Sequence, residues 1–122
     1  MPKKLAPILL TDRLILRPKQ EKDVPQMLDL FRNKEVRQYL GGYPPMEEHA
    51  MLRMIRNQGK TDWAVALKDS DEYIGECMLL KVVDGYLGEI GWYFRRSFWG
   101  QGYAREAAEA VITYSRDTLG VK

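Results

Sequence analysis

The fold is decided by the stretch Glu89-Ile90-Gly91-Trp92-Tyr93-Phe94-Arg95-Arg96-Ser97-Phe98-Trp99-Gly100-Gln101-Gly102-Tyr103-Ala104-Arg105-Glu106-Ala107. Its pattern predicts a strand, a turn with two glycines and the start of a helix. Gly100 and Gly102 have no side chain that would keep a ligand away from the backbone N–H groups. The first turn of the helix leaves further N–H groups unpaired and carries partial positive charge. Together these features predict an anion site suited to a phosphate or pyrophosphate.

Outside this stretch, the spacing of apolar residues alternates between the periods of strands and helices. Strands are predicted at residues 8–17, 62–68, 72–83 and 86–94, with a hairpin turn at Asp84-Gly85. Helices are predicted at residues 21–31, with Asp23 as N-cap, in a short piece through Val36 and Leu40, and at residues 46–57 and 103–118. Residues 41–45 form a loop. We expect an α+β domain, with a mostly antiparallel mixed sheet of about four strands and flanking helices.

Composition restricts the class of protein. The chain has 122 residues, so residues 1–122 are expected to form a single domain. Its formal net charge of +2 argues against broad nucleic-acid or membrane-surface binding. One histidine, His49, and one cysteine, Cys77, cannot supply the ligand set of a zinc enzyme, and no metal is expected.

The sequence also bears on where the protein resides. No apolar run approaches the roughly 18 residues that span a bilayer, and no apolar segment follows the charged start of the chain. The single Cys77 cannot form an intramolecular disulfide, which is typical of a reducing compartment. We therefore expect a cytoplasmic protein without membrane partners. A nucleic-acid-binding module is an alternative that only the slight positive charge supports.

Four motifs occur in order along the chain. They are Leu10-Thr11-Asp12-Arg13-Leu14-Ile15-Leu16-Arg17-Pro18, Tyr73-Ile74-Gly75-Glu76, Glu89-Ile90-Gly91-Trp92 and Trp99-Gly100-Gln101-Gly102-Tyr103-Ala104. Together they resemble the Gcn5-related N-acetyltransferase (GNAT) family and, more narrowly, its ribosomal-protein-alanine acetyltransferase (RimJ/RimL-like) branch. The last motif looks like the acyl-CoA pyrophosphate loop of the family, with Trp99 where many relatives carry Arg or Gln. The resemblance covers nearly the whole chain and implies an acyl-CoA N-acyltransferase fold.

The resemblance implies that acetyl-CoA is the cosubstrate and that its acetyl group passes to a primary amine, on a protein N-terminus or a small molecule. The pyrophosphate would lie on the loop, where the expected binding residues are Gly100, Gln101, Gly102, Tyr103 and Ala104. The pantetheine arm would pair with the exposed backbone edge of the fourth predicted strand, at Trp92, Tyr93 and Phe94.

Other side chains acquire expected roles from the same resemblance. Glu89 is the candidate base, because a protonated amine must lose a proton before it can attack a thioester. Trp99 would shield the pyrophosphate loop. Arg95 and Arg96 precede the loop, and this position favours contact with the nucleotide phosphates. Tyr43 is a candidate contact for the acceptor amine.

The end of the sequence departs from the family pattern. Relatives continue after the pyrophosphate loop and its helix with a fifth strand, another helix and a final pair of strands, whereas this sequence stops at Lys122. We expect a C-terminally truncated GNAT fold that lacks its last strands. Its fourth strand would be a sheet edge, available for a homodimer. The alternative function is therefore a catalytically incomplete remnant that binds CoA or only dimerises.

Overall fold

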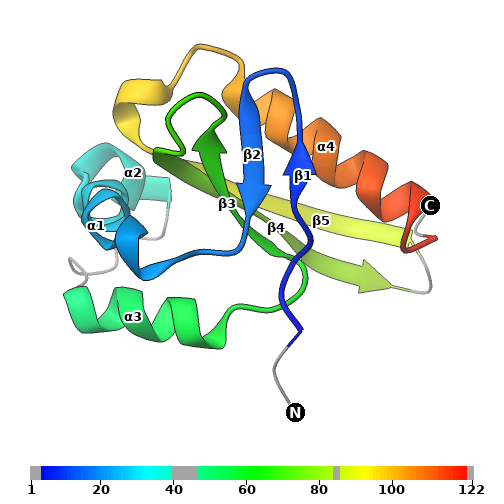
Figure 1. Cartoon of the computed structure of the whole chain (residues 1–122), viewed down its shortest axis with the longest axis horizontal. Helices are drawn as coiled ribbons and strands as arrows, with labels where there is room; N and C mark the ends of the chain where they lie inside the picture. Colours follow the sequence, from blue (N-terminus) through cyan, green and yellow to red (C-terminus); the bar gives the residue numbers. More distant parts are fainter. Residues whose placement is uncertain (1–3, 40–46, 84–85, 121–122) are drawn as a thin grey trace.

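The computed structural model describes residues 4–39, 47–83 and 86–120. The predicted loop at residues 41–45, the candidate acceptor contact Tyr43 and the hairpin turn Asp84-Gly85 lie outside the described residues. The observed architecture is a single sheet with helices on its faces, which confirms the predicted α+β class (Figure 1).

The sheet contains five strands in the order β1-β2-β3-β4-β5, and every neighbouring pair is antiparallel. The strands are β1 (Leu9–Leu10), β2 (Leu14–Arg17), β3 (Asp62–Leu67), β4 (Tyr73–Val83) and β5 (Tyr86–Phe94). No parallel pair occurs within the described residues, so the expected mixed character of the sheet is not seen there. The strand bounds at β3, β4 and β5 lie within one residue of those predicted.

The prediction of one strand over residues 8–17 is wrong, because the chain turns back on itself between β1 and β2. Leu9 pairs with Leu16, and Leu10 pairs with Ile15. The Thr11 N–H donates to the Leu14 carbonyl over 3.0 Å, and the Leu14 N–H donates to Thr11 Oγ1 over 2.9 Å. A tight turn leaves the alternation of apolar residues intact on both sides, so period alone cannot separate a hairpin from a long strand.

The helices lie on both faces of the sheet (Figure 1). They are the 3-10 turns η1 (Glu21–Asp23) and η2 (Arg96–Phe98) and the α-helices α1 (Val24–Arg32), α2 (Lys34–Tyr39), α3 (Glu48–Asn57) and α4 (Tyr103–Asp117). Asp23 precedes α1, as predicted, but its side chain makes no capping bond to that helix. Its carboxylate instead accepts hydrogen bonds from the Gln20 N–H and from the Arg17 guanidinium.

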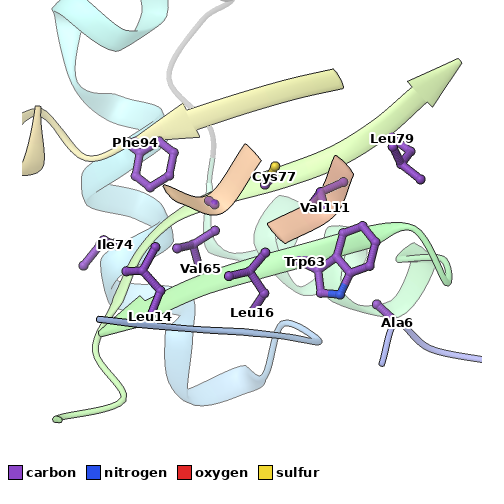
Figure 2. Packing of buried hydrophobic residues seen from close by; sticks show 11 residues of the cluster. Ala6, Leu14, Leu16, Trp63, Val65, Ile74, Cys77, Leu79, Phe94 and Val111 are labelled. Atoms are coloured by element: carbon purple, nitrogen blue, oxygen red, sulfur yellow. The ribbon is translucent and has the colours of Figure 1, made fainter. Parts of the chain in front are cut away.

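Two apolar clusters hold these layers together, one on each face of the sheet. The alternation of β3 shows this division, since Trp63 and Val65 join the cluster beneath α4 while Ala64 joins the cluster beneath α1 and α3. Figure 2 shows the first cluster, to which Leu14 of β2, Trp63 of β3, Phe94 of β5 and Val111 of α4 contribute. Burial of apolar surface on both faces is the main term that stabilises such a three-layer arrangement.

Helix α4 contacts the sheet through a stripe of small side chains. Ala107, Val111 and Ser115 are buried, and the Ser115 hydroxyl donates to the Val111 carbonyl over 2.7 Å. The predicted pair of Arg105 and Glu109 is confirmed on the exposed side of the helix, with 3.0 Å between Nε and Oε1. The buried stripe therefore fixes the rotation of α4, and with it the direction of the helix N-terminus.

The pairing of β4 with β5 brings the end of β5 close against its neighbour. Gly75 lies opposite Phe94, and a Cβ atom at Gly75 would stand 2.4 Å from the Tyr93 carbonyl oxygen. Only glycine permits this approach without displacement of the backbone. Within the described residues β5 is an edge strand, so the backbone groups on its outer side have no partner strand.

Candidate functional site

The loop that follows β5 has the backbone conformation that its glycines permit. Gly100 has a φ of 76° and Gly102 a φ of 83°, in the left-handed region that other residues rarely adopt. Gly102 is also the N-cap of α4, and its carbonyl accepts the first helical bond from the Glu106 N–H over 3.1 Å. The N–H groups of the first helical turn therefore face the loop without intrahelical partners. The helix dipole makes this end attractive to anions.

A cavity of about 500 Å³ lies between the end of β5, the loop and the first turn of α4. Eight of the predicted binding residues line it: Trp92, Tyr93, Phe94, Trp99, Gly100, Gly102, Tyr103 and Ala104. Three further residues, Val36, Phe98 and Arg105, also line it. No local pattern predicted that Val36 would line the cavity, because α2 reaches the cavity only through the tertiary fold. The lining is mainly apolar, apart from backbone groups and Arg105.

Three residues that were predicted to bind the cofactor do not line this cavity: Gln101, Arg95 and Arg96. The Gln101 side chain donates to the Ser97 carbonyl over 3.1 Å. The Arg95 guanidinium donates to Asp29 over 2.8 Å, to Glu72 over 2.7 Å and to the Tyr73 carbonyl over 2.9 Å. Arg95 thus joins α1 and β4 to the end of β5 in this structure, and its charge is already matched by carboxylates.

Arg96 and Trp99 form a stacked pair beside the loop. The Arg96 guanidinium carbon lies 4.6 Å from the centre of the Trp99 ring, and Arg96 Nε donates to Glu35 over 2.7 Å. The Trp99 indole N–H donates to the Phe94 carbonyl over 2.7 Å. The indole therefore ties the loop back to the last residue of β5, and Arg96 covers its face.

A second group of residues at the loop comes from the turn between β1 and β2 and was not predicted from the sequence. Arg13 Nε donates to Glu106 Oε1 over 2.7 Å, and Arg13 Nη1 donates to the Gln101 carbonyl over 3.0 Å. The guanidinium carbon also lies 4.2 Å from the centre of the Tyr103 ring. Arg13 and Glu106 are 93 residues apart in the chain, so no local pattern predicts that they meet.

The Glu106 carboxylate is fixed by several donors. Besides Arg13 Nε, it accepts hydrogen bonds from the Thr11 hydroxyl over 2.5 Å and from the Arg13 backbone N–H over 3.0 Å. Partial burial alone would raise the pKa of Glu106, but these donors hold it below the ordinary value. Glu106 therefore carries its negative charge in the first turn of α4 at neutral pH, where Arg13 is its cationic partner.

The candidate base Glu89 lies on β5 opposite Lys81 and is exposed. It does not line the cavity, whereas Tyr93, four residues further along the same strand, does. Alternation along a strand places Glu89 and Tyr93 on the same face of the sheet. The structure thus brings eight of the predicted cofactor residues together around the cavity and leaves Glu89 outside that group.

Another carboxylate, which the sequence analysis did not select as a site, is buried on the same face. Glu76 is 2% exposed on β4, and Lys19 Nζ lies 3.1 Å from its Oε1 atom. Burial raises the pKa of Glu76 even though Lys19 lies beside it, and the phenol of the buried Tyr73 also has its pKa raised by burial. Glu76 pairs with Tyr93 in the β4–β5 register, which places this polar group behind the cavity wall.

Two broader observations concern the part of the chain that the structure describes. None of its helices is both long enough and apolar enough to cross a membrane. It also contains no group of three or more His, Cys, Asp or Glu side chains arranged to hold a metal ion.

Comparison with known proteins places this geometry in a family. Residues 13–122 match the family model described as "Acetyltransferase (GNAT) domain". The chain is 31% identical over 106 residues to the "Uncharacterized N-acetyltransferase YnaD" of Bacillus subtilis, which covers 85% of this chain and 62% of that protein. It is 30% identical over 122 residues to the "Uncharacterized N-acetyltransferase p20" of Bacillus licheniformis, covering 93% and 68%. The chain thus spans roughly two thirds of these relatives.

Solved structures support the fold. A GNAT-family acetyltransferase from Bacillus anthracis superposes with a TM-score of 0.82 at 23% identity, covering 94% of this chain and 69% of that one. A structure titled as RimL, the ribosomal L7/L12 alpha-N-protein acetyltransferase, gives a TM-score of 0.64 at 19% identity, covering 99% and 71%. At these identities the likeness shows the acyltransferase fold, and it does not select the RimJ/RimL-like branch.

Proposed function

Because this chain belongs to the acetyltransferase (GNAT) domain family, we propose that it binds acetyl-CoA and transfers the acetyl group to a primary amine. One observation carries the proposal. Two glycines at positive φ lead into the 15-residue helix α4 beside an apolar cavity of about 500 Å³. Unpaired backbone N–H groups suit a diphosphate, and an apolar wall suits an acylated pantetheine arm.

The binding residues in this proposal are those of the loop and of the β5 edge. The amides of Gln101, Gly102, Tyr103 and Ala104 would hold the pyrophosphate, and the outer edge of β5 from Trp92 to Phe94 would pair with the pantetheine amides. Arg96 is the better candidate for a nucleotide phosphate than Arg95, because Arg96 is exposed and pairs with one carboxylate, Glu35, whereas Arg95 is paired with both Asp29 and Glu72.

The proposed chemistry needs a base and an oxyanion donor. Glu89 would accept the proton of the incoming ammonium, directly or through a water molecule, since its carboxylate is exposed on β5. The neutral amine would then attack the thioester carbonyl, the carbon–sulfur bond would break, and CoA would leave as a thiolate. The nitrogen would lose a second proton to become an amide, and the thiolate would take up a proton to become the free thiol. Backbone N–H groups on the outer edge of β5 would stabilise the negative charge that develops on the carbonyl oxygen.

The acceptor in this proposal is a protein N-terminus or a small-molecule amine. The resemblance of the sequence motifs to the RimJ/RimL-like branch supports the protein N-terminus, while the uncharacterised relatives favour neither acceptor. We also propose a cytoplasmic location. The single cysteine, Cys77, supports it, because one cysteine cannot form an intramolecular disulfide, and this is typical of a protein in a reducing compartment.

A second candidate function is a protein that binds CoA or dimerises without turnover. The edge position of β5 favours it, because Trp92 on β5 is 48% exposed and Leu80 on the adjoining strand β4 is 51% exposed. Two such edges could pair across a homodimer. Steady release of free CoA in the presence of any amine would show turnover and would exclude this candidate.

The deciding experiment is a calorimetric titration of acetyl-CoA into the purified chain, with light scattering of the same sample to give its oligomeric state. Saturable binding, about one molecule per chain, is the expected result, because the loop and the cavity are both formed by this chain. A folded sample that does not bind acetyl-CoA would contradict the proposal. A panel of amines with thiol detection would then separate turnover from binding alone.

A further inference from the structure

We propose that Arg13 is a positioning residue for the phosphate-binding loop. Its guanidinium holds the Gln101–Gly102 peptide so that the N–H group of this peptide faces a bound diphosphate. This inference rests on the proposed function, because it concerns how the same loop would bind acetyl-CoA. Arg13 comes from the turn between β1 and β2, and its guanidinium reaches the carbonyl of Gln101 in the loop.

The first step is that the Arg13 guanidinium is itself held in place. Glu106 Oε1 accepts from Arg13 Nε over 2.7 Å, and the Tyr103 ring lies 4.2 Å from the guanidinium carbon. The backbone N–H of Arg13 also donates to Glu106 over 3.0 Å. Side chain and main chain are thus bound to the same carboxylate, which restricts the guanidinium although 45% of the side chain is exposed.

The second step concerns the peptide group between Gln101 and Gly102. Arg13 Nη1 donates to the Gln101 carbonyl over 3.0 Å. In a planar trans peptide the carbonyl and the following N–H point in opposite directions, so a bond that fixes the carbonyl also fixes the Gly102 N–H on the other side. Gly102, on one side of this peptide, is a glycine at positive φ and gives the peptide unusual freedom to rotate, which the bond from Arg13 restricts.

The third step is electrostatic. Glu106 places a negative charge in the first turn of α4, close to where the phosphates would lie. The charge of Arg13 neutralises it, and the guanidinium donates to both Glu106 and the Gln101 carbonyl. A lysine could supply the charge but has no planar fork with which to bridge two acceptors in fixed directions.

The test compares acetyl-CoA with acetylpantetheine, which lacks the nucleotide diphosphate. Arg13→Gln should weaken acetyl-CoA binding about tenfold, the scale of one lost charge-assisted hydrogen bond, and leave acetylpantetheine binding unchanged. Lys68→Gln is the matched control, because exposed Lys68 donates to the Thr11 carbonyl of the same turn over 3.1 Å and is absent from the loop contacts. An equal loss for both ligands, or no loss for either, would overturn the inference.

Glu106→Gln separates positioning from charge. It removes a negative charge near the phosphates, so a purely electrostatic role for the Arg13–Glu106 pair predicts tighter acetyl-CoA binding. The positioning role predicts weaker binding, because the amide of Gln cannot accept from Arg13 Nε and also retain the other bonds of the carboxylate. Tighter binding by this variant would contradict the proposal.

Arg13→Lys covers the case in which Arg13→Gln does not fold. The lysine variant retains the charge, so the expected result is a loss of acetyl-CoA affinity of several-fold, together with a smaller shift of the Gly102 amide resonance on titration. Wild-type affinity and an unchanged amide shift would show that charge alone suffices. A wild-type chain that fails to bind acetyl-CoA would overturn the proposed function itself, whereas equal binding by wild type and Arg13→Gln would overturn only this inference.

Discussion

The arginines around the loop take their roles from their partners. Arg95 pairs with Asp29 and Glu72, Arg96 stacks on Trp99, and Arg13 bridges Glu106 and the Gln101 carbonyl. All three are near the same loop, but their guanidinium groups face different acceptors. A guanidinium matched by carboxylates contributes to local structure, whereas an incompletely matched one can contact an anionic ligand.

At the scale of single residues, the proposed role of Glu89 as the base is tested by replacing its carboxylate with the amide of glutamine, which has nearly the same shape. Glu89→Gln should lower kcat about a hundredfold at neutral pH, because an amide cannot accept the proton of the ammonium. The deficit should shrink as pH rises toward the pKa of the acceptor amine, since the free amine needs no base. The KM for acetyl-CoA should stay unchanged, because Glu89 does not line the cavity.

Steady-state rates over a pH series measure this effect. Glu48→Gln is a suitable control, because Glu48 is an exposed carboxylate at the start of α3 and makes no contact with the cavity. Wild-type kcat in Glu89→Gln would remove Glu89 from the mechanism.

At the scale of the element, the loop and α4 act together because the loop ends on the N-cap of the helix. The buried stripe of Ala107, Val111 and Ser115 sets the helix against the sheet, and Trp99 and Arg13 anchor the loop from two sides. The direction of the unpaired N–H groups thus depends on packing that lies outside the loop itself.

Gly102→Ala tests the loop conformation. Alanine at a φ of 83° costs about 1–2 kcal/mol, and its Cβ would stand 3.4 Å from Arg13 Nη2. We expect lower stability and acetyl-CoA binding weakened about tenfold, since relaxing the strain rotates the peptide that carries a phosphate donor.

The matched control for this loop variant is Gly120→Ala. Gly120 has a φ of 70° but lies beyond the other end of α4, away from the cavity. Thermal unfolding should show a similar loss of stability in both variants, and calorimetry should show a loss of binding only in Gly102→Ala. Equal affinities in the two variants would argue against a role for the loop conformation.

At the scale of the whole molecule, a buried arginine joins segments that are distant in sequence. Arg17 at the end of β2 is 4% exposed and donates to both oxygens of Asp23, over 2.8 and 2.9 Å, and to Asp71 over 2.8 Å. Asp71 lies in the turn between β3 and β4 at a φ of 60° and also pairs with Lys22. The charge network thus fixes one end of the sheet to the start of α1.

Because of this network, the free energy of unfolding should decrease at low pH. Partial burial would raise the pKa of Asp71, but hydrogen bonds from Lys22 and Arg17 hold it below the ordinary value of 3.8. A lowered folded-state pKa means that the stabilisation is present above the unfolded-state value and is lost as pH falls through the folded one. The lowered pKa of Glu106 acts in the same direction.

Asp71→Asn should therefore lower the free energy of unfolding at pH 7 by about 1 kcal/mol, a modest value because a third of the Asp71 side chain is exposed. The loss relative to wild type should begin to narrow as pH falls below about 4, where the carboxyl of the unfolded chain takes up a proton, and should disappear only below the lowered folded-state pKa. Asparagine tolerates a positive φ, so the turn should persist. Urea unfolding at pH 7 and pH 3 measures both effects, with Asp69→Asn in the same turn as control. A constant deficit at both pH values would exclude the proposed charge effect.

Local patterns predicted those elements in which the spacing of apolar residues stays regular along one continuous segment. Alternation located β3, β4 and β5, and the glycine pair located the turn before α4. They did not reveal the hairpin of β1 and β2, because an apolar alternation continues across a tight turn. Nor did they predict η2, a single 3-10 turn that is too short to have a period.

The sequence by itself determined the order of the elements, the family and the glycine loop, because each depends on neighbours within one segment. Only the tertiary structure decided which side chains meet at that loop. Arg13 reaches Gln101 and Glu106 from a distant turn, Val36 reaches the cavity from α2, and Arg95 is drawn to Asp29 and Glu72. The physical reason is that contacts between distant residues depend on how the layers pack, and packing depends on all the buried side chains together.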